Sequence, residues 1–491
     1  MTSMEIISAR RPKFWPQWFA ASIIHVLGLL SGLVGGWTSP YLAKLTQGNE
    51  SLVVTKDEAS WIASLLHLSR PLGSIIAAVL VSKFGSQKAV FLGGLPHVIA
   101  WTLFLINESV SWIYASRMFS GIAMGMYLSS FPLYIGEIGH PRIRGALIGL
   151  VAQGSAIGYL LGNYMGAYVK MRTFAIINLV ISVVYMGLFY FFPDSSHYFI
   201  RRDRVALAER SLRWYNRKKD VTVELRELRA YIGRPQKLTL KESFQQLTTP
   251  LNRKILAMIV CVYLFMQLSG INTIAMYQEI LLTTLKIDVI PPSLVVVCVG
   301  VVAITANLLA IYTNDHFGRR TMLAVSTLGV AINFALIGGH YLLFRNQYDI
   351  SNIQWVVISE FMMYIFFLNI GLTHIPSCLL SEIFSPELKE IGSCIANIVC
   401  SFSAFVASKS YQPLLDATSE EFIFFFYAIL VFLMFVYTIV VIPETKGKSL
   451  QEIQEMLTKR SERTNERTNE RIKQNDTLIR RPRNDDMISK S

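Results

Sequence analysis

The stretch ILAMIVCVYLFMQLSGINTIAMYQEILL, residues 255–282, decides the fold class. It is long enough to cross a bilayer, because a membrane-spanning helix needs about 20 mostly apolar residues. Its middle, however, is the polar stretch Gln267–Asn272, which holds two amides, a hydroxyl and a glycine. Polar groups in hydrocarbon are costly and persist where they face a bundle interior or a water-filled cavity, which indicates a solute path through a membrane. The alternative is that these groups bond one packed helix to the next.

Further apolar runs fill most of the chain, which has 491 residues, 52% of them hydrophobic and 16% charged. Together with a mean hydropathy of +0.42, this composition is typical of a multi-span membrane protein. The runs, of which the third and sixth are short, lie at residues 19–42, 61–81, 90–105, 112–134, 146–168, 174–192, 255–282, 292–312, 322–344, 356–380, 391–415 and 422–442. We therefore expect an all-α integral membrane protein with twelve transmembrane helices in two six-helix bundles.

A basic segment between the sixth and seventh runs divides the chain into these two halves. Residues 201–254 contain fifteen basic and six acidic residues, with helix-like stretches at Val205–Tyr215 and Val223–Tyr231. A weak internal repeat supports the division, since Lys83–Gly85 follows the second run as His316–Gly318 follows the eighth. Parallel halves around a central site are typical of alternating-access transporters. The predicted parts are a cytoplasmic N-terminus (1–18), a first bundle (19–192), a cytoplasmic helical linker (193–254), a second bundle (255–442) and a basic cytoplasmic tail (443–491).

The net charge of +13 is distributed in a way that excludes nucleic acid as the partner and predicts the orientation of the chain. With the N-terminus inside, most of the 46 Lys and Arg residues fall in cytoplasmic segments, as the positive-inside rule requires. Both termini are then cytoplasmic, in the cell membrane, and Asn49 lies in an external loop as a candidate glycosylation site. For the tail there are two alternatives: a solvated segment, or one that binds anionic lipid of the inner leaflet.

Catalysis and cofactor binding are not predicted. The five cysteines all lie in apolar runs, where they are typical small buried hydrophobes and not a disulfide or metal framework. The sequence also holds no nucleophile with a paired base, no metal-ligand spacing and no phosphate loop. We therefore expect a protein that is not an enzyme and needs no cofactor.

A set of motifs occurs along the chain in a specific order. It comprises Thr55–Trp61, Arg117 with Gly121 and Gly125, Pro132–Glu137, Arg144–Gly145, Gln267–Asn272 with Tyr277, Asp315–Arg320 and Pro443–Leu450. In this the chain resembles the sugar porters of the major facilitator superfamily, and among them the insect facilitated trehalose transporters. The resemblance implies the major facilitator fold and a carbohydrate substrate, such as trehalose, glucose or a related sugar.

Charged residues of these motifs are predicted to gather at the cytoplasmic ends of the spans. They are Arg117, Glu137, Arg144, Asp315, Arg319, Glu382 and Lys389. The resemblance implies a cytoplasmic gate, a charge network between the halves that breaks when that side opens; the alternative is that these charges anchor helix ends. The first half departs from the family pattern, because Ser82–Lys88 lacks the usual acid and much of the basic cluster.

The resemblance also implies a central sugar site. Gln267 and Asn272 match sugar-contacting positions and Tyr277 an outer gating position, whereas other positions have changed and read Met266, Ala303, Asn369, Ser377, Cys400 and Ser401. We predict a substrate site formed by Gln267, Asn272, Tyr277, Asn369, Ser377 and Ser401. Because each buried donor or acceptor contributes roughly 1 kcal/mol when paired, the changes indicate an altered choice of solute.

Two charges lie within the predicted spans, Arg70 and Glu360. They could pair with each other, bind substrate or extend to a membrane interface, and we interpret both as structural. The first span holds no acid, unlike proton-coupled members of the family, which favours passive uniport. The predicted function is facilitated diffusion of a sugar by alternating access. The alternatives are a proton-coupled sugar symporter and a non-transporting sugar receptor on the same scaffold.

Overall fold

The computed structural model describes residues 14–48, 52–107, 109–140, 142–218, 220–232, 240–348, 353–384, 388–446, 448, 452–453 and 455–457. All regular structure in these ranges is helical, and twelve helices or runs of joined helices are long and apolar enough to cross a membrane. The expectation of an all-α protein with twelve spans is confirmed. Asn49 and the tail beyond Leu457 lie outside the described residues, so the glycosylation and tail-lipid predictions stay predictions.

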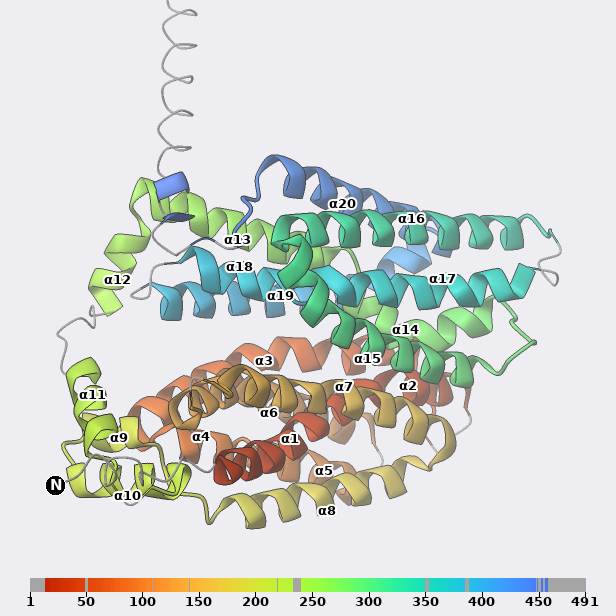
Figure 1. Cartoon of the computed structure of the whole chain (residues 1–491). Helices are drawn as coiled ribbons and strands as arrows, with labels where there is room; N and C mark the ends of the chain where they lie inside the picture. The colour runs from red at the N-terminus through yellow and green to blue at the C-terminus, as the bar shows by residue number, and fades with distance from the viewer. Residues whose placement is uncertain are drawn as a thin grey trace, which may run out of the picture.

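The first six spans form one bundle, drawn in red to yellow in Figure 1. Its helices are α1 (Trp15–Gly36) with α2 (Thr38–Gln47), α3 (Lys56–Phe84), α4 (Ser86–Leu92) with α5 (Leu95–Ile106), α6 (Val110–Ile138), α7 (Arg144–Tyr168) and α8 (Met171–Phe189). The α4 to α5 boundary falls at Gly93 and Gly94, where two glycines interrupt the short third run.

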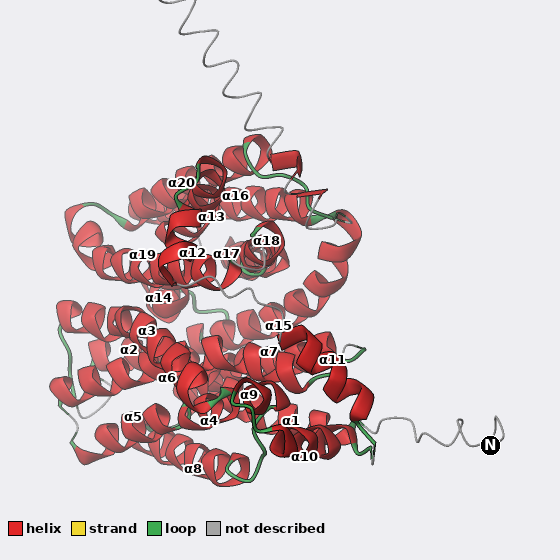
Figure 2. Cartoon of the chain, turned by 90° about the vertical axis from the view of Figure 1, so that its left-hand side faces the viewer, coloured by secondary structure: helices red, strands yellow, loops and turns green. Residues whose placement is uncertain are grey.

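The last six spans form the second bundle, which lies above the first in both views of the molecule (Figures 1 and 2). Its helices are α13 (Pro250–Leu268) with α14 (Ile271–Thr284), α15 (Pro292–Phe317), α16 (Arg319–Arg345), α17 (Gln354–Phe367) with the π-helical turn η3 (Leu368–Leu372) and α18 (Ile375–Ile383), α19 (Lys389–Ala417) and α20 (Glu420–Val440). The predicted arrangement as two six-helix bundles is therefore confirmed.

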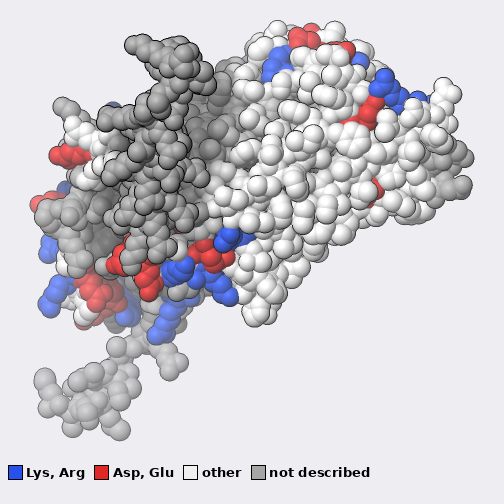
Figure 3. Space-filling model, turned by 90° about the horizontal axis from the view of Figure 1, so that it is seen from above, with Lys and Arg blue, Asp and Glu red and all other residues white. Residues whose placement is uncertain are grey.

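Between the bundles the chain forms four short helices at one end of the molecule. They are α9 (Ser196–Arg201), α10 (Val205–Asn216), α11 (Thr222–Ile232) and α12 (Leu240–Leu247), and the two helices predicted for this segment match α10 and α11. We call this end, on the left in Figure 1, the linker end, and the opposite end of the bundles the far end. Seen from above, a broad belt free of charged side chains separates the charged patches near the two ends (Figure 3). Such a belt suits the hydrocarbon layer of a bilayer.

Helices α1 and α7 pack backbone to backbone in the first bundle, because glycines line the seam between them. Gly32 and Gly36 of α1 face Gly158 and Gly162 of α7, at the four-residue spacing that puts glycines on one face of a helix. A methyl group on Gly158 would lie 2.1 Å from the carbonyl oxygen of Leu29. Small residues of this kind let the backbones of membrane helices pack directly, where dispersion replaces the missing hydrophobic driving force.

Candidate functional site

The polar stretch of the seventh span breaks that span into two helices. Helix α13 ends at Leu268 and α14 begins at Ile271, with Gly270 between them at a φ of +76°. Only glycine adopts this left-handed conformation without strain. A Cβ at Gly270 would also lie 2.2 Å from the ring of Tyr427, so the position has no space for a side chain. Breaks of this kind mark solute sites in transporters, because the interrupted helix exposes polar groups inside the bundle.

The break brings Gln267 and Asn272 together. The amide of Asn272 donates a hydrogen bond to Oε1 of Gln267, and Nε2 of Gln267 donates to Sγ of Cys400 on α19 at 3.1 Å. The same sulfur accepts from Nη2 of Arg70, on α3 of the first half, at 3.6 Å. One polar cluster therefore joins both halves of the molecule. Sequence reasoning found its two amides but missed the roles of Arg70 and Cys400, and the only signal for Arg70 was its place inside an apolar run.

Ser377 and Tyr277 lie on either side of this cluster. Ser377 is exposed, and its hydroxyl lies 3.3 Å from that of Tyr263, one helical turn before Gln267. Tyr277 is buried on α14, where its ring packs against that of Tyr411 at 4.7 Å between centroids. Ser401 follows Cys400 and is buried. Four of the six predicted substrate residues thus lie on α13, α14 and α18 around the break, and a fifth lies on α19.

Asn369, the sixth predicted residue, belongs to a second broken span. It lies in η3, where its amide donates to the carbonyl of Ile365 at 2.9 Å, so one of its donors is used within the turn. Ser326 of α16 stabilises this turn, because its hydroxyl donates to the carbonyl of Phe367 at 2.6 Å and accepts from the amide of Leu372 at 2.9 Å. The structure describes no hydrogen bond from Asn369 to the Gln267 cluster.

At the far end the two halves are bonded to each other. Lys409 of α19 forms an ion pair with Asp57 of α3 at 2.7 Å and lies over the ring of Trp61 at 4.3 Å. The backbone amide of Glu279 donates to Ser39 Oγ at 3.1 Å, and the Tyr159 hydroxyl donates to the carbonyl of Ala275 at 3.3 Å. Each of these contacts crosses from one half to the other. The far end is therefore closed.

At the linker end the predicted gate residues bond within their own half. Glu137 accepts from the hydroxyls of Ser86 and Ser195, each at 2.5 Å. Glu382 pairs with Arg319 at 3.1 Å and accepts from the Thr445 hydroxyl at 2.5 Å. The two arrangements correspond position by position, with a serine in the first half where the second has an arginine. The missing charges at Ser82–Lys88 therefore leave Glu137 with hydroxyl donors where Glu382 has an arginine.

Arg144 also bonds locally, since its guanidinium donates to the carbonyl of Gly139 at 3.3 Å. The side chains of Asp315 and Lys389 lie outside the described part of the structure. The hydrogen bonds and ion pairs described for Glu137, Arg144 and Glu382 each stay within one half of the molecule.

Arg117 does not belong to this network, and its predicted place at the cytoplasmic ends is wrong. The fourth span enters from the far end, so Arg117 lies two turns into α6 on that side. It is 3% exposed and donates to the carbonyls of Ile62 and Val34 at 3.1 Å and to Thr38 Oγ1 at 2.7 Å. Its guanidinium also lies over the ring of Trp37 at 4.9 Å. Arg117 is a structural tie between α1, α3 and α6.

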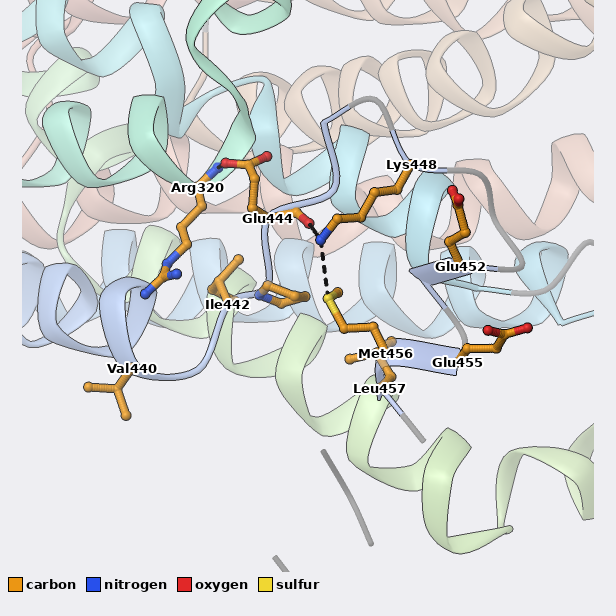
Figure 4. A pocket seen from close by; sticks show the side chains of 10 residues that line it. Arg320, Val440, Ile442, Glu444, Lys448, Glu452, Glu455, Met456 and Leu457 are labelled. Carbon is orange, nitrogen blue, oxygen red and sulfur yellow. Dashed lines mark hydrogen bonds between the residues drawn. The ribbon is translucent and has the colours of Figure 1, made fainter. Parts of the chain in front are cut away.

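A second acidic residue supports each half at the linker end. Asp194 accepts from the amides of Gln87 and Ser195 at 3.3 and 2.9 Å, as Glu444 accepts from those of Arg319 and Arg320 at 3.0 and 3.1 Å. Figure 4 shows Glu444 at the edge of a surface pocket of about 740 Å³, where Nζ of Lys448 donates to the Glu444 carbonyl at 3.0 Å. This pocket lies at the linker end of the second half, away from the Gln267 cluster.

Asp194 predicts a pH dependence of stability. Burial raises the pKa of Asp194 to about 6, from an ordinary value near 3.8, and outweighs the two amide donors. A carboxyl whose pKa is raised on folding favours the folded state below its unfolded pKa, and this contribution is lost as pH rises through the folded pKa. The loss amounts to roughly 3 kcal/mol between pH 4 and 6. We expect Asp194→Asn, which mimics the protonated acid, to remove this part of the pH profile.

The measurement is the midpoint of thermal unfolding in detergent, from pH 4 to pH 7, for the original chain and the variant. The difference between the two curves isolates Asp194 from the other titrating groups. The original chain should lose stability relative to Asp194→Asn as pH rises. Curves that run parallel across the range would contradict the expectation.

Comparison with known proteins agrees with this geometry. The family model described as "Sugar (and other) transporter" matches residues 20–457. The chain is 28% identical over 450 residues to the facilitated trehalose transporter Tret1 of Bombyx mori, an alignment that covers 91% of this chain and 88% of that protein. It is 27% identical over 451 residues to Tret1 of Drosophila mojavensis, of which it spans about half, 52%.

Solved structures show the same fold. The inward-open xylose transporter XylE from E. coli superposes with a TM-score of 0.73 at 20% identity, covering 90% of this chain and 99% of that one. The proton:xylose symporter XylE bound to 6-bromo-6-deoxy-D-glucose gives 0.70 at 19% identity, covering 91% of this chain and 100% of that one. The predicted major facilitator fold is thereby confirmed, as is the resemblance to sugar porters. With the family model matched over nearly all of its spans, the chain belongs to the family of sugar (and other) transporters.

Proposed function

We propose that this protein carries carbohydrate through the cell membrane by facilitated diffusion, with alternating access to the site at the break of the seventh span. The observation that carries the proposal is the polar cluster of Gln267, Asn272, Cys400 and Arg70, which joins the halves at mid-membrane. Cross-half contacts close the far end, while the described gate residues bond within their halves. Alternating access requires a site that is closed to one side of the membrane while the contacts on the other side do not join the halves.

The orientation follows from charge. The linker end carries the basic segment 201–254, so by the positive-inside rule we assign it to the cytoplasm, with both termini. The described structure is then the inward-facing state. The basic tail is placed on the same side, where anionic lipid of the inner leaflet is its proposed partner.

Removal of the amides tests the site. Gln267→Ala removes both the acceptor of Asn272 and the donor to Cys400, and Asn272→Ala removes the other end of the bond. A lost substrate bond together with an orphaned partner costs roughly 1–3 kcal/mol, and each 1.4 kcal/mol is tenfold in affinity. We expect saturable uptake into proteoliposomes to fall at least tenfold in either variant. The substrates are radiolabelled trehalose, glucose, fructose and a polyol.

Gln245→Ala is the matched control, because Gln245 is exposed on α12 outside the membrane spans. It should transport normally. Saturable binding of a sugar without flux would identify a receptor instead of a transporter. Uptake that collapses with a proton uncoupler would identify a symporter. Because α1 contains no Asp or Glu, we expect uptake to be insensitive to the uncoupler.

A further inference from the structure

Arg70 lies at the depth where a charge in a membrane protein is most costly. Helix α3 runs from Lys56 to Phe84, and Arg70 is its middle residue. About 21 Å of helix extends on either side, at 1.5 Å per residue. An arginine side chain is much shorter than that distance, so Arg70 does not reach either membrane interface by extending along the helix. The interpretation of Arg70 as an interfacial anchor is therefore wrong.

The guanidinium of Arg70 points across the boundary between the halves. Its described side-chain hydrogen bond goes to Sγ of Cys400 at 3.6 Å, a weak acceptor at long range. The side chain is only partly buried. Arg70 also lies close enough to Tyr263 for its charge to act on that hydroxyl, so α3, α13 and α19 all meet here.

The surroundings of Arg117, two turns inside α6, are different. Arg117 is enclosed, and two carbonyls and one hydroxyl accept its hydrogen bonds. Arg70 is left with one thiol and keeps most of its five donors for another acceptor. An arginine that only ties helices together needs several protein acceptors, as Arg117 has, and gains nothing from unused donors, as Arg70 has.

No acidic side chain in the described structure neutralises Arg70. The acids on helices around it lie near helix ends and have other partners: Asp57 pairs with Lys409, Glu137 accepts from two serines, and Glu382 pairs with Arg319. Glu360, which the sequence offers as a partner for Arg70, instead lies 2.9 Å from His340 Nδ1. Within the described residues, no ion pair of Arg70 is present. A cation at mid-membrane marks a substrate or ion path by default, and here the described residues supply no counter-charge.

We infer that Arg70 makes this a carrier for carbohydrates that bear a carboxylate, such as uronic acids. The inference rests on the proposed function, because it names the substrate class of the same site. A carboxylate presents two oxygens to the planar fork of a guanidinium and neutralises its charge. The hydroxyls of a neutral sugar can accept hydrogen bonds from the guanidinium but leave its charge uncompensated. The amides of Gln267 and Asn272, next to the shared Cys400, are then available for the hydroxyls of the same molecule.

The test compares sugars that differ only in the oxidation of one carbon. Uptake of glucuronate and glucose, and of galacturonate and galactose, is measured in proteoliposomes with the full-length chain and with Arg70→Gln. We expect the original chain to prefer each uronate at least tenfold over its neutral partner, and Arg70→Gln to lose that preference, whatever its overall rate of uptake. Arg172→Gln is the control, since Arg172 is exposed at the start of α8, and its preference should be unchanged.

Net charge movement gives a second readout that needs no variant. Passive uptake of a monoanion is electrogenic, so an imposed potential of 100 mV, positive inside, should raise its equilibrium accumulation roughly 50-fold and leave neutral sugars unaffected. This measurement tests whether the carrier accepts uronates even if Arg70→Gln fails to reach the membrane.

The outcomes separate the two proposals. Flux of neutral sugars with exclusion of uronates, or a preference that Arg70→Gln does not change, overturns the inference and leaves the proposed function standing. Absence of any carbohydrate flux overturns both.

Discussion

Replacement of Gly158 by isoleucine is expected to prevent assembly of the first bundle. A Cβ at this position meets the backbone of α1, 2.1 Å from the carbonyl oxygen of Leu29 and 2.8 Å from its carbonyl carbon. Neither atom can turn aside as a flexible side chain can, so α1 and α7 must separate along the whole glycine seam. Ordinary overpacking costs about 1–3 kcal/mol, and the loss of a helix pair adds to it. We expect a loss of more than about 4 kcal/mol, which is exceptional for one substitution.

Gly149→Ile is the matched control for this prediction. Gly149 lies on the same helix, and no heavy atom comes within 4 Å of a Cβ built there. Both variants change one glycine of α7 to the same side chain, so they share the same change in helix propensity. The measurement is the yield of monodisperse protein in detergent and its midpoint of thermal unfolding. Equal yields and midpoints for the two variants would contradict the close-packing argument.

Arg117→Leu is expected to have the second-largest effect on stability. The change removes the charged donor of three buried bonds, to the carbonyls of Ile62 and Val34 and to the Thr38 hydroxyl. Hydrogen bonds to charged groups are worth about 1.5–3 kcal/mol each, and the stacking on Trp37 is worth about 2 kcal/mol when desolvated. We expect a loss of about 3–5 kcal/mol, seen as a large drop in the unfolding midpoint.

Arg117→Lys and Arg172→Leu complete the experiment. Lysine keeps the charge but has no fork to reach three acceptors at once, so it should lie between the original chain and Arg117→Leu. Arg172 is exposed, and its loss should be nearly neutral. If Arg117→Leu were as stable as Arg172→Leu, the bonds of Arg117 would carry no weight in the fold.

The number and order of the spans follow from sequence because hydrophobic length is a local property. The break at Gly270 was not predicted, because residues 255–282 read as one apolar run and the left-handed backbone of Gly270 is a feature of the structure. The predicted depth of Arg117 conflicts with the predicted topology itself. With the N-terminus inside, the fourth run, 112–134, starts on the external side, so Arg117 near its start lies away from the cytoplasmic ends, as the structure has it.

The contacts of Cys400 were beyond sequence reasoning. They require that α3, α13 and α19, which are far apart in the chain, each be rotated to bring one side chain to the same point. A rotation of one residue, about 100°, removes the contact. Helical periodicity fixes which residues share a face but not which face meets which neighbour, so the central cluster emerges only when the halves are placed together.

The closure at the far end has a kinetic consequence. Its described polar contacts are two ion pairs with largely exposed carboxylates, Asp57 and Asp416, and single hydrogen bonds at Ser39, Ser60 and Tyr159. Exposed ion pairs are worth about 0–1 kcal/mol and neutral hydrogen bonds about 1 kcal/mol each, so these polar contacts contribute little to the energy that holds this side shut. Because few polar contacts must break, the empty carrier is expected to change between its inward- and outward-facing states without bound solute. Solute on the trans side of the membrane should then accelerate turnover only slightly, which makes the protein suited to net uptake and not to one-for-one exchange.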